Sequence, residues 1–156
     1  MRGIHHAGRT LATIAWAAWS MAAVPAAHAD DLPIVSIQAV TGTAAFAGAV
    51  FQQSIQMAVD EVNAQGGIHG SKIHLTVRDN AGDKGQAINL ANQAIERDRA
   101  LLVLGPTLTV DSTAVAPVFN DKRTPFLGFG GSDAILKAGP WSLKFRQGTD
   151  VDGPQL

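Results

Sequence analysis

Residues 101–133, LLVLGPTLTVDSTAVAPVFNDKRTPFLGFGGSD, hold two copies of one pattern. In the first copy, the apolar run Leu101–Leu104 breaks into glycine, proline and hydroxyl residues. In the second, Phe126–Phe129 breaks into Gly130, Gly131, Ser132 and Asp133. Short runs that are apolar at every residue are typical of parallel strands covered on both faces. Such strands place backbone N–H groups and hydroxyls at one edge of a sheet, where open α/β sheets bind small and often anionic ligands. Ser, Thr and Asp are also the favoured helix caps, so an ordinary capping role stays open for each copy.

Further elements alternate on both sides of this stretch. Strands are predicted at Pro33–Val40, Ile73–Val77 and Trp141–Arg146. Two amphipathic helices are predicted between the first three strands, and their buried positions are Phe51, Ile55, Ala58, Val59 and Val62 in the first and Ala87, Ile88, Ala91, Ala94 and Ile95 in the second.

Two more helices complete the predicted order. One spans about 112–120 and contains Pro117, which normally kinks or breaks a helix. A short one lies near 133–137. Strands that alternate with helices through short connections predict an α/β fold with a doubly wound, Rossmann-like parallel sheet.

The first 29 residues have the features of a secretory signal peptide. Arg2 and Arg9 give a positive start, Leu11–Ala23 is apolar, and Ala27-His28-Ala29 is a small-x-small cleavage pattern before Asp30. The apolar run is shorter than the roughly twenty residues that span a bilayer. The sequence therefore predicts export to the bacterial periplasm without a membrane span, and an uncleaved anchor is the alternative.

Composition narrows the function classes. The chain has 156 residues, 46% of them hydrophobic, and no cysteine, which excludes a disulfide framework, a thiolate zinc site and a lipid-anchored cysteine. A net charge of −1 gives no support for a nucleic-acid partner or an anionic membrane surface.

Enzyme signatures are weak. His69 and His74, the two histidines after the predicted signal, do not form a metal-spaced pair, and no Gly-x-Ser-x-Gly elbow occurs. The segment 128–133 resembles a dinucleotide loop but has Asp133 where the third glycine belongs. A binding role needs only a rim of hydroxyls and backbone donors, which Thr107, Thr109, Ser132 and the backbone of Gly130 would supply. No cofactor and no metal are expected.

Three segments together carry a family resemblance, AVDEVNAQGGIHGSKIHLTVRDNAGDKGQAINLANQAI (58–95), LGPTLT (104–109) and TPFLGFGGSDAIL (124–136). They resemble the periplasmic branched-chain amino-acid-binding proteins, the type I solute receptors of ABC importers. The resemblance runs from about Pro33 to Gln155. Its most specific part is the run from Asp60 to Ile68 with Gly70, followed by Asp79 and Asp83.

The resemblance implies a set of ligand contacts. The hydroxyl of Thr109 would meet the carboxylate of an amino acid, the carbonyl of Gly130 its ammonium, and the hydroxyl of Ser132 both groups. An aromatic residue often lies over the ligand in this family, but this chain has Ala47 at that position, with Phe46 adjacent, and no tyrosine. Side-chain specificity therefore stays open, because relatives also bind amides, urea or aromatic acids.

The resemblance also implies a division of the chain. Residues 1–29 would be the signal, 30–147 the first ligand-binding lobe, and 148–156 the start of a crossover to a second lobe that this sequence lacks. The expected function is that of the periplasmic substrate-binding component of an amino-acid importer, which delivers its ligand to a membrane permease. An extracytoplasmic sensing domain of the same fold is the alternative, and an enzyme is a distant third.

Overall fold

The computed structural model describes residues 31–145. Five strands and four helices alternate along this part of the chain. The strands are β1 (Leu32–Gln38), β2 (Ile73–Asp79), β3 (Leu102–Leu104), β4 (Phe126–Gly128) and β5 (Ser142–Lys144). The helices are α1 (Ala45–Ala64), α2 (Lys84–Glu96), α3 (Thr109–Asp121) and α4 (Ala134–Lys137). The predicted signal at 1–29 and the predicted crossover at 148–156 lie outside the described residues.

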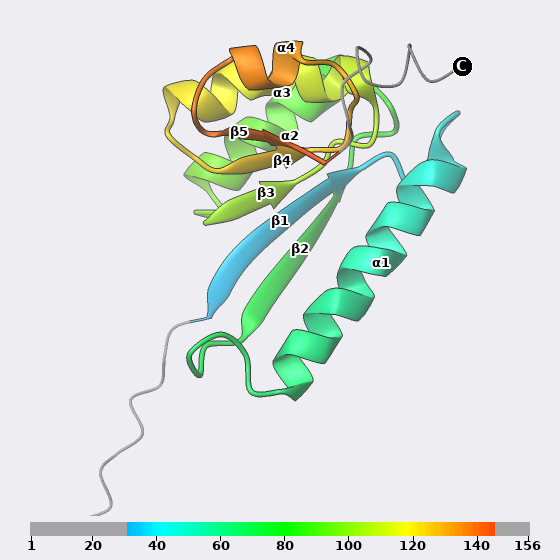
Figure 1. Ribbon diagram of the computed structural model, residues 1–156. Coiled ribbons are helices and arrows are strands. Elements are labelled where there is room, and N and C mark those ends of the chain that lie inside the picture. The colour runs from blue at the N-terminus through cyan, green and yellow to red at the C-terminus, as the bar shows by residue number, and fades with distance from the viewer. Residues whose placement is uncertain (1–30, 146–156) are drawn as a thin grey trace, which may run out of the picture.

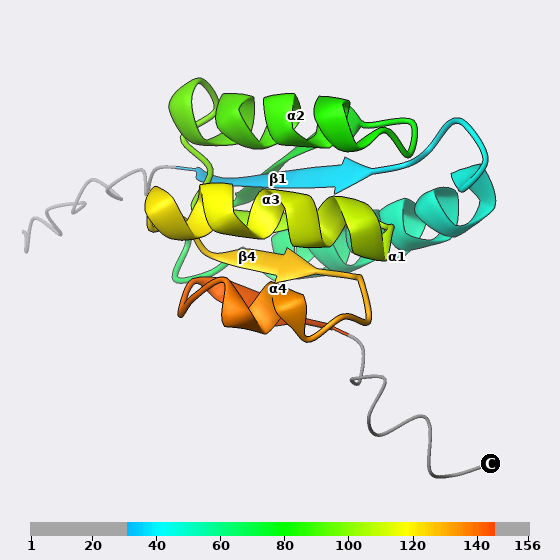
Figure 2. The ribbon, with the colours of Figure 1, turned by 90° about the horizontal axis from the view of Figure 1, so that it is seen from above.

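All strand pairs are parallel, in the order β2-β1-β3-β4-β5. Helices α2 and α3 cover one face of the sheet, and α1 lies along β1 and β2 on the other face (Figures 1 and 2). The predicted α/β fold with a doubly wound parallel sheet is confirmed. The strand order reverses between β1 and β3, and such a switch point is where ligands bind in sheets of this kind.

The core lies between the sheet and the helices α2 and α3. Val35 and Ile37 of β1, Val103 of β3 and Phe126 of β4 are buried there. Phe119 of α3 stacks on Phe126 with ring centroids 4.9 Å apart. Alanines give α2 a smooth surface on this core, because Ala87, Ala91 and Ala94 are fully buried.

The opposite face of the sheet is only partly covered. Ile34 and Ser36 lie in register with Leu102 and Leu104, and Leu104 in register with Leu127, so these side chains share the α1 face. Because α1 packs along β1 and β2, Leu143 of β5 remains 55% exposed. The buried positions predicted for α1 are therefore only partly covered: Val59 is buried, whereas Ala58 is exposed.

Helix α3 begins at Thr109, three residues before the predicted start. Leu108 is extended and its carbonyl accepts the first helical bond, from the N–H of Ser112 at 2.9 Å. Pro117 does lie inside the helix, but on its exposed side, where a helix that bends around a core can lose one hydrogen bond.

Candidate ligand-binding site

The predicted site residues come from the loops that follow β1, β3 and β4. In a parallel sheet these loops leave from the same edge, and β1 and β3 flank the switch point. Phe46 and Ala47 lie in the first turn of α1, Thr109 is the first residue of α3, and Gly130 and Ser132 lie between β4 and α4. Residues 31–145 enclose no pocket.

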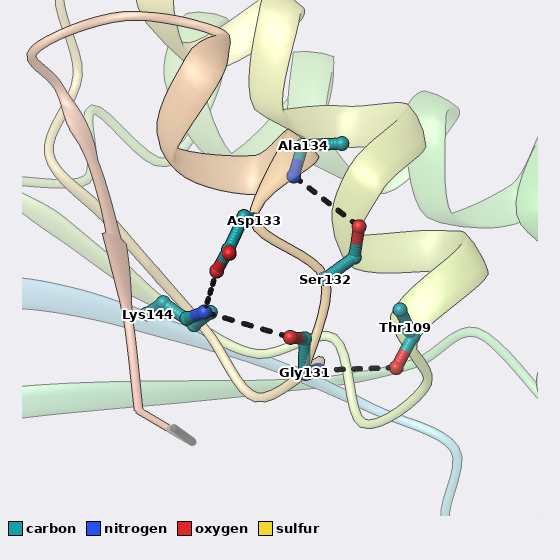
Figure 3. Close-up of polar contacts among 6 residues, drawn as sticks. All are labelled: Thr109, Gly131, Ser132, Asp133, Ala134 and Lys144. Atoms are coloured by element: carbon teal, nitrogen blue, oxygen red, sulfur yellow. Dashed lines mark hydrogen bonds and ion pairs between the residues drawn. The ribbon is translucent and has the colours of Figure 1, made fainter. Parts of the chain in front are cut away.

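Thr109 and Gly130 are in direct backbone contact. A Cβ atom placed on Gly130 would lie 2.6 Å from the Cα atom of Thr109, so only glycine allows this approach. The N–H of Gly131 donates to Oγ1 of Thr109 at 3.2 Å (Figure 3). The structure therefore brings together two of the residues that the sequence predicted to share a site.

Ser132 lies on the same loop, two residues before the short helix α4. Its Oγ accepts the N–H of Ala134 at 3.2 Å, a local side-chain to backbone hydrogen bond (Figure 3). In both Thr109 and Ser132 the oxygen accepts a backbone N–H, so each hydroxyl proton stays available to a ligand. These local hydrogen bonds are thus compatible with a ligand-binding role of both hydroxyls.

The first turn of α3 adds backbone donors to this edge. Within residues 31–145, the N–H groups of Thr109, Val110 and Asp111 have no acceptor, as is usual for the first turn of a helix. The positive end of the helix dipole favours a carboxylate there. The carbonyl of Gly130 accepts no hydrogen bond from the described residues and is an acceptor of the kind that an ammonium group needs.

Phe46 and Ala47 are not brought onto the hydroxyl pair. Both are exposed, Phe46 by 86%, on the first turn of α1. The aromatic residues next to the loop after β4 are others: Phe129 lies 4.7 Å from Phe51 of α1 and 5.5 Å from Phe145, measured between ring centroids. This cluster could not be predicted from the sequence, since its members lie far apart along the chain.

Thr107 was predicted to be part of the polar rim, and this prediction is wrong. Thr107 is buried, its hydroxyl donates to Oε1 of Gln38 at 2.7 Å, and it accepts the N–H of Ala39 at 3.2 Å. Gln38 in turn donates to Ser36, whose hydroxyl donates to Gln52 of α1 at 2.8 Å. This buried chain ties α1, β1 and the loop after β3 together beneath the site.

Asp79 and Asp83, which follow the most specific part of the family-like segment, have structural roles. Asp79 accepts hydrogen bonds from Val40, Thr41 and Ala81. Burial alone would raise the pKa of Asp79, but these hydrogen bonds, the one from the Thr41 hydroxyl foremost, outweigh it and lower the pKa below 3.8. Asp83 caps α2 by accepting the N–H of Gln86 at 2.6 Å.

A buried carboxyl group lies behind the first turn of α3. Asp111 is fully buried, and Oδ2 accepts a hydrogen bond from Nδ2 of Asn80 at 2.8 Å. Burial raises the pKa of Asp111 above 3.8, the Asn80 hydrogen bond opposes this, and the nearby charge of Asp83 adds to it. The second oxygen of Asp111 and the amide oxygen of Asn80 have no partner in the described structure.

Nothing in residues 31–145 resembles a metal centre, because no three His, Cys, Asp or Glu side chains gather there. His69 lies in a turn with a φ of 51°, and His74 is on the exposed side of β2. No helix of the described region is long and apolar enough to cross a bilayer.

The sequence profile of the family described as "Periplasmic binding protein" matches residues 31–155. The chain belongs to the periplasmic binding protein family. Membership implies a periplasmic location and a binding role rather than an enzymatic one.

Curated relatives agree with this family. The chain is 39% identical over 99 residues to the Leu/Ile/Val-binding protein BraC3 of Rhizobium johnstonii, a match that covers 64% of this chain and 26% of the relative. It is 28% identical over 146 residues to the Leu/Ile/Val-binding protein homolog 7 of Brucella abortus, with 88% of this chain and 36% of the relative covered.

Solved structures of the family have the same fold. A putative branched-chain amino acid ABC transporter protein from Rhodospirillum rubrum superposes with a TM-score of 0.75 at 26% identity and covers 80% of this chain and 36% of its own. LivJ of Streptococcus pneumoniae, solved with isoleucine, superposes with a TM-score of 0.73 at 23% identity. This match covers 76% of this chain and 34% of LivJ. The chain thus spans about a third of the length of these relatives and matches one lobe of the solved structures.

Proposed function

We propose that this chain forms the first ligand-binding lobe of the substrate-binding component of an ABC-type amino-acid importer. It holds a branched-chain or related amino acid in the periplasm for delivery to a membrane permease. The relatives named for leucine, isoleucine and valine support this ligand class.

One observation carries the proposal: Gly130 lies against Thr109, and Ser132 follows on the same loop. This arrangement gathers two hydroxyl donors, the backbone donors at the start of α3 and one free carbonyl within a single loop pair. An α-amino acid presents a carboxylate and an ammonium on the same carbon. The hydroxyls of Thr109 and Ser132 and the start of α3 suit the carboxylate, and the carbonyl of Gly130 suits the ammonium.

The described lobe offers one wall of a site. Its hydrogen bonds to a ligand compete with bulk water, so each contributes little net free energy. We therefore expect this chain alone to bind leucine, isoleucine or valine with millimolar affinity at best, about −4 kcal/mol.

Isothermal titration of the chain with L-leucine, L-isoleucine and L-valine tests the proposal. Thr109→Val, which keeps the shape of the side chain and removes the hydroxyl, is expected to weaken binding measurably. Thr76→Val, in the middle of β2, is the matched control and should bind as the unmodified chain does. Equal binding by both variants would contradict the role of Thr109.

A sensing domain for an aromatic acid is the second candidate. The cluster of Phe51, Phe129 and Phe145 next to the loop after β4 favours it, because aromatic rings stack well on one another. Related solved structures were obtained with 3,4-dihydroxybenzoic acid and 4-hydroxybenzoate. Titration with 4-hydroxybenzoate distinguishes the two ligand classes, since tighter binding of this acid than of leucine would favour an aromatic acid.

A further inference from the structure

Lys144 is a nearly buried cation that none of the roles above uses. It is the last residue of β5 and pairs in register with Gly128 of β4. Its side chain is only 7% exposed, whereas lysine is almost never buried unless it is paired.

The ammonium group of Lys144 lies beside the loop after β4, between Gly131 and Asp133 (Figure 3). Nζ lies 3.5 Å from the carbonyl oxygen of Gly131 and forms an ion pair with the carboxylate of Asp133. Asp133 immediately precedes α4, so the two contacts join the edge strand to both ends of the turn 131–133.

We propose that Lys144 is a positioning residue that fixes the loop 130–133 in its ligand-binding conformation. This inference rests on the proposed function only in so far as that loop contacts the ligand. Gly131 is held from two sides: Thr109 of α3 accepts its N–H, and Lys144 of β5 contacts its carbonyl. Gly130 and Ser132, the two predicted ligand contacts, are the neighbours of this residue.

Burial makes this pair different from a surface ion pair. Lys122 and Glu96, which are 3.6 Å apart, have side chains that are 51% and 66% exposed, so water competes for both charges. The ammonium of Lys144 has little access to water, and its desolvation must be offset by the two oxygens on the loop. If the loop moves away, the ammonium loses both partners, so the open conformation is disfavoured.

Hydrogen–deuterium exchange of the whole chain, followed by mass spectrometry, tests this role. The peptide Phe129–Leu136 holds the N–H groups of Gly131, Ala134 and Ile135, which are all hydrogen-bonded in or next to the loop. In Lys144→Met, which keeps the apolar stem, this peptide should exchange about tenfold faster, because the closed loop loses the interaction that opposes opening. Lys137→Met on the exposed side of α4 removes the same charge and should leave the rate unchanged.

The peptide Leu32–Gln38 of β1 reports whether a variant is folded. If this β1 peptide also exchanges faster in Lys144→Met, the variant is globally destabilised, and Asp133→Asn is used to test the role of the ion pair. Asp133 is 41% exposed, so its substitution creates no buried void. Acceleration confined to Phe129–Leu136 supports the role of Lys144. An unchanged rate in this peptide, in the variant that keeps β1 protected, overturns it.

A leucine titration of the same variants separates positioning from a purely structural role. Lys144→Met should weaken the binding of L-leucine by about tenfold at nearly constant melting temperature, equivalent to about 1.4 kcal/mol. Unchanged affinity together with faster loop exchange overturns the positioning role. If the unmodified chain itself does not bind leucine, the proposed function fails, and the exchange rates alone still decide whether Lys144 holds the loop.

Discussion

At the scale of single residues, we predict that the Ser132 hydroxyl contributes to ligand binding and not to folding. Its hydroxyl accepts only one local hydrogen bond, from the N–H of Ala134 at the start of the four-residue helix α4, so folding depends little on it. In a receptor of this family that has both lobes, Ser132→Ala should weaken amino-acid binding by roughly 1–3 kcal/mol, because a buried polar partner of the ligand loses its hydrogen bond. The melting temperature without ligand should barely change. Calorimetry and thermal unfolding measure the two quantities, and Ser54→Ala on α1 is the control. A strongly destabilised apo variant would contradict the assignment of Ser132 to the site.

The buried carboxyl group of Asp111 predicts how the stability of the chain depends on pH. Its pKa in the folded chain is raised above the ordinary value of 3.8, mainly by burial, so folding favours the neutral carboxyl group. The stability that this gives is present below pH 3.8 and is lost as the pH rises through the folded-state pKa. Asp111→Asn, which is never charged, should therefore lose less stability than the unmodified chain between about pH 4 and pH 7.

Urea denaturation at several pH values measures this difference. Asp121→Asn, at the exposed end of the same helix, is the matched control. The effect of Asp79 on stability has the opposite dependence on pH. Its lowered pKa contributes stability that is present above pH 3.8 and is lost as the pH falls through the folded-state pKa. The prediction is contradicted if the free energy of unfolding rises from about pH 4 to pH 7 by the same amount in the unmodified chain and in Asp111→Asn. Ionisation of the buried Asp111 would then not destabilise the fold.

Single residues also show where reading the sequence alone reaches its limit. Ser36 and Gln38 alternate with apolar residues in β1, a pattern that is typical of a solvent-exposed face, yet both are fully buried. They are satisfied by Gln52 and Thr107, and the hydrogen bond from Thr107 joins positions 69 residues apart. Lys144 was missed for a related reason: a lone lysine in a strand gives no sign that its partner lies on another loop.

At the scale of elements, the alternation of strands and helices was predictable, because each element has its own apolar period. The segment around Asn63 was recognised by its sequence, and the structure explains it: the amide of Asn63 both donates to and accepts from the backbone of Ile73. Gly67 is required because a Cβ atom there would lie 2.0 Å from the carbonyl oxygen of Ser71. These residues shape the turn between α1 and β2 and do not touch the candidate site.

The start of α3 was harder to place. Pro117 suggested a late start, but the helix begins at Thr109 and accommodates the proline on its exposed side. Pro117→Ala restores an N–H that can donate to the carbonyl of Thr113, so the free energy of unfolding should rise by roughly 2 kcal/mol. Urea denaturation measures it, and Pro140→Ala outside the helices is the control. No gain in Pro117→Ala would show that the helix is adapted to the proline.

At the scale of the whole molecule, the α1 side of the sheet leaves an apolar surface over β3, β4 and β5. We call the residues Leu102, Leu104, Leu127, Leu143 and Phe145 the open face. Phe145 is 64% exposed, and contiguous exposed apolar surfaces promote association. The chain alone should therefore self-associate as its concentration rises.

Sedimentation velocity measures this association. Leu143→Lys places a charge in the open face and should shift the chain toward monomer. Leu136→Lys, an exposed apolar residue of α4 outside that face, should not. A chain that stays monomeric at high concentration without either substitution would show that α1 and the sheet edge protect the open face sufficiently.

The central claim is that the edge formed by the loops after β3 and β4 binds an α-amino acid. Backbone amide NMR of the chain during titration with L-leucine tests it most directly, with D-leucine as the control. We predict that the amides of Thr109, Gly131 and Ser132 shift together, with one dissociation constant in the millimolar range. Shifts confined to other residues, or none at millimolar leucine, would contradict the site. Micromolar binding by the monomeric chain would show that one lobe is sufficient for the whole site.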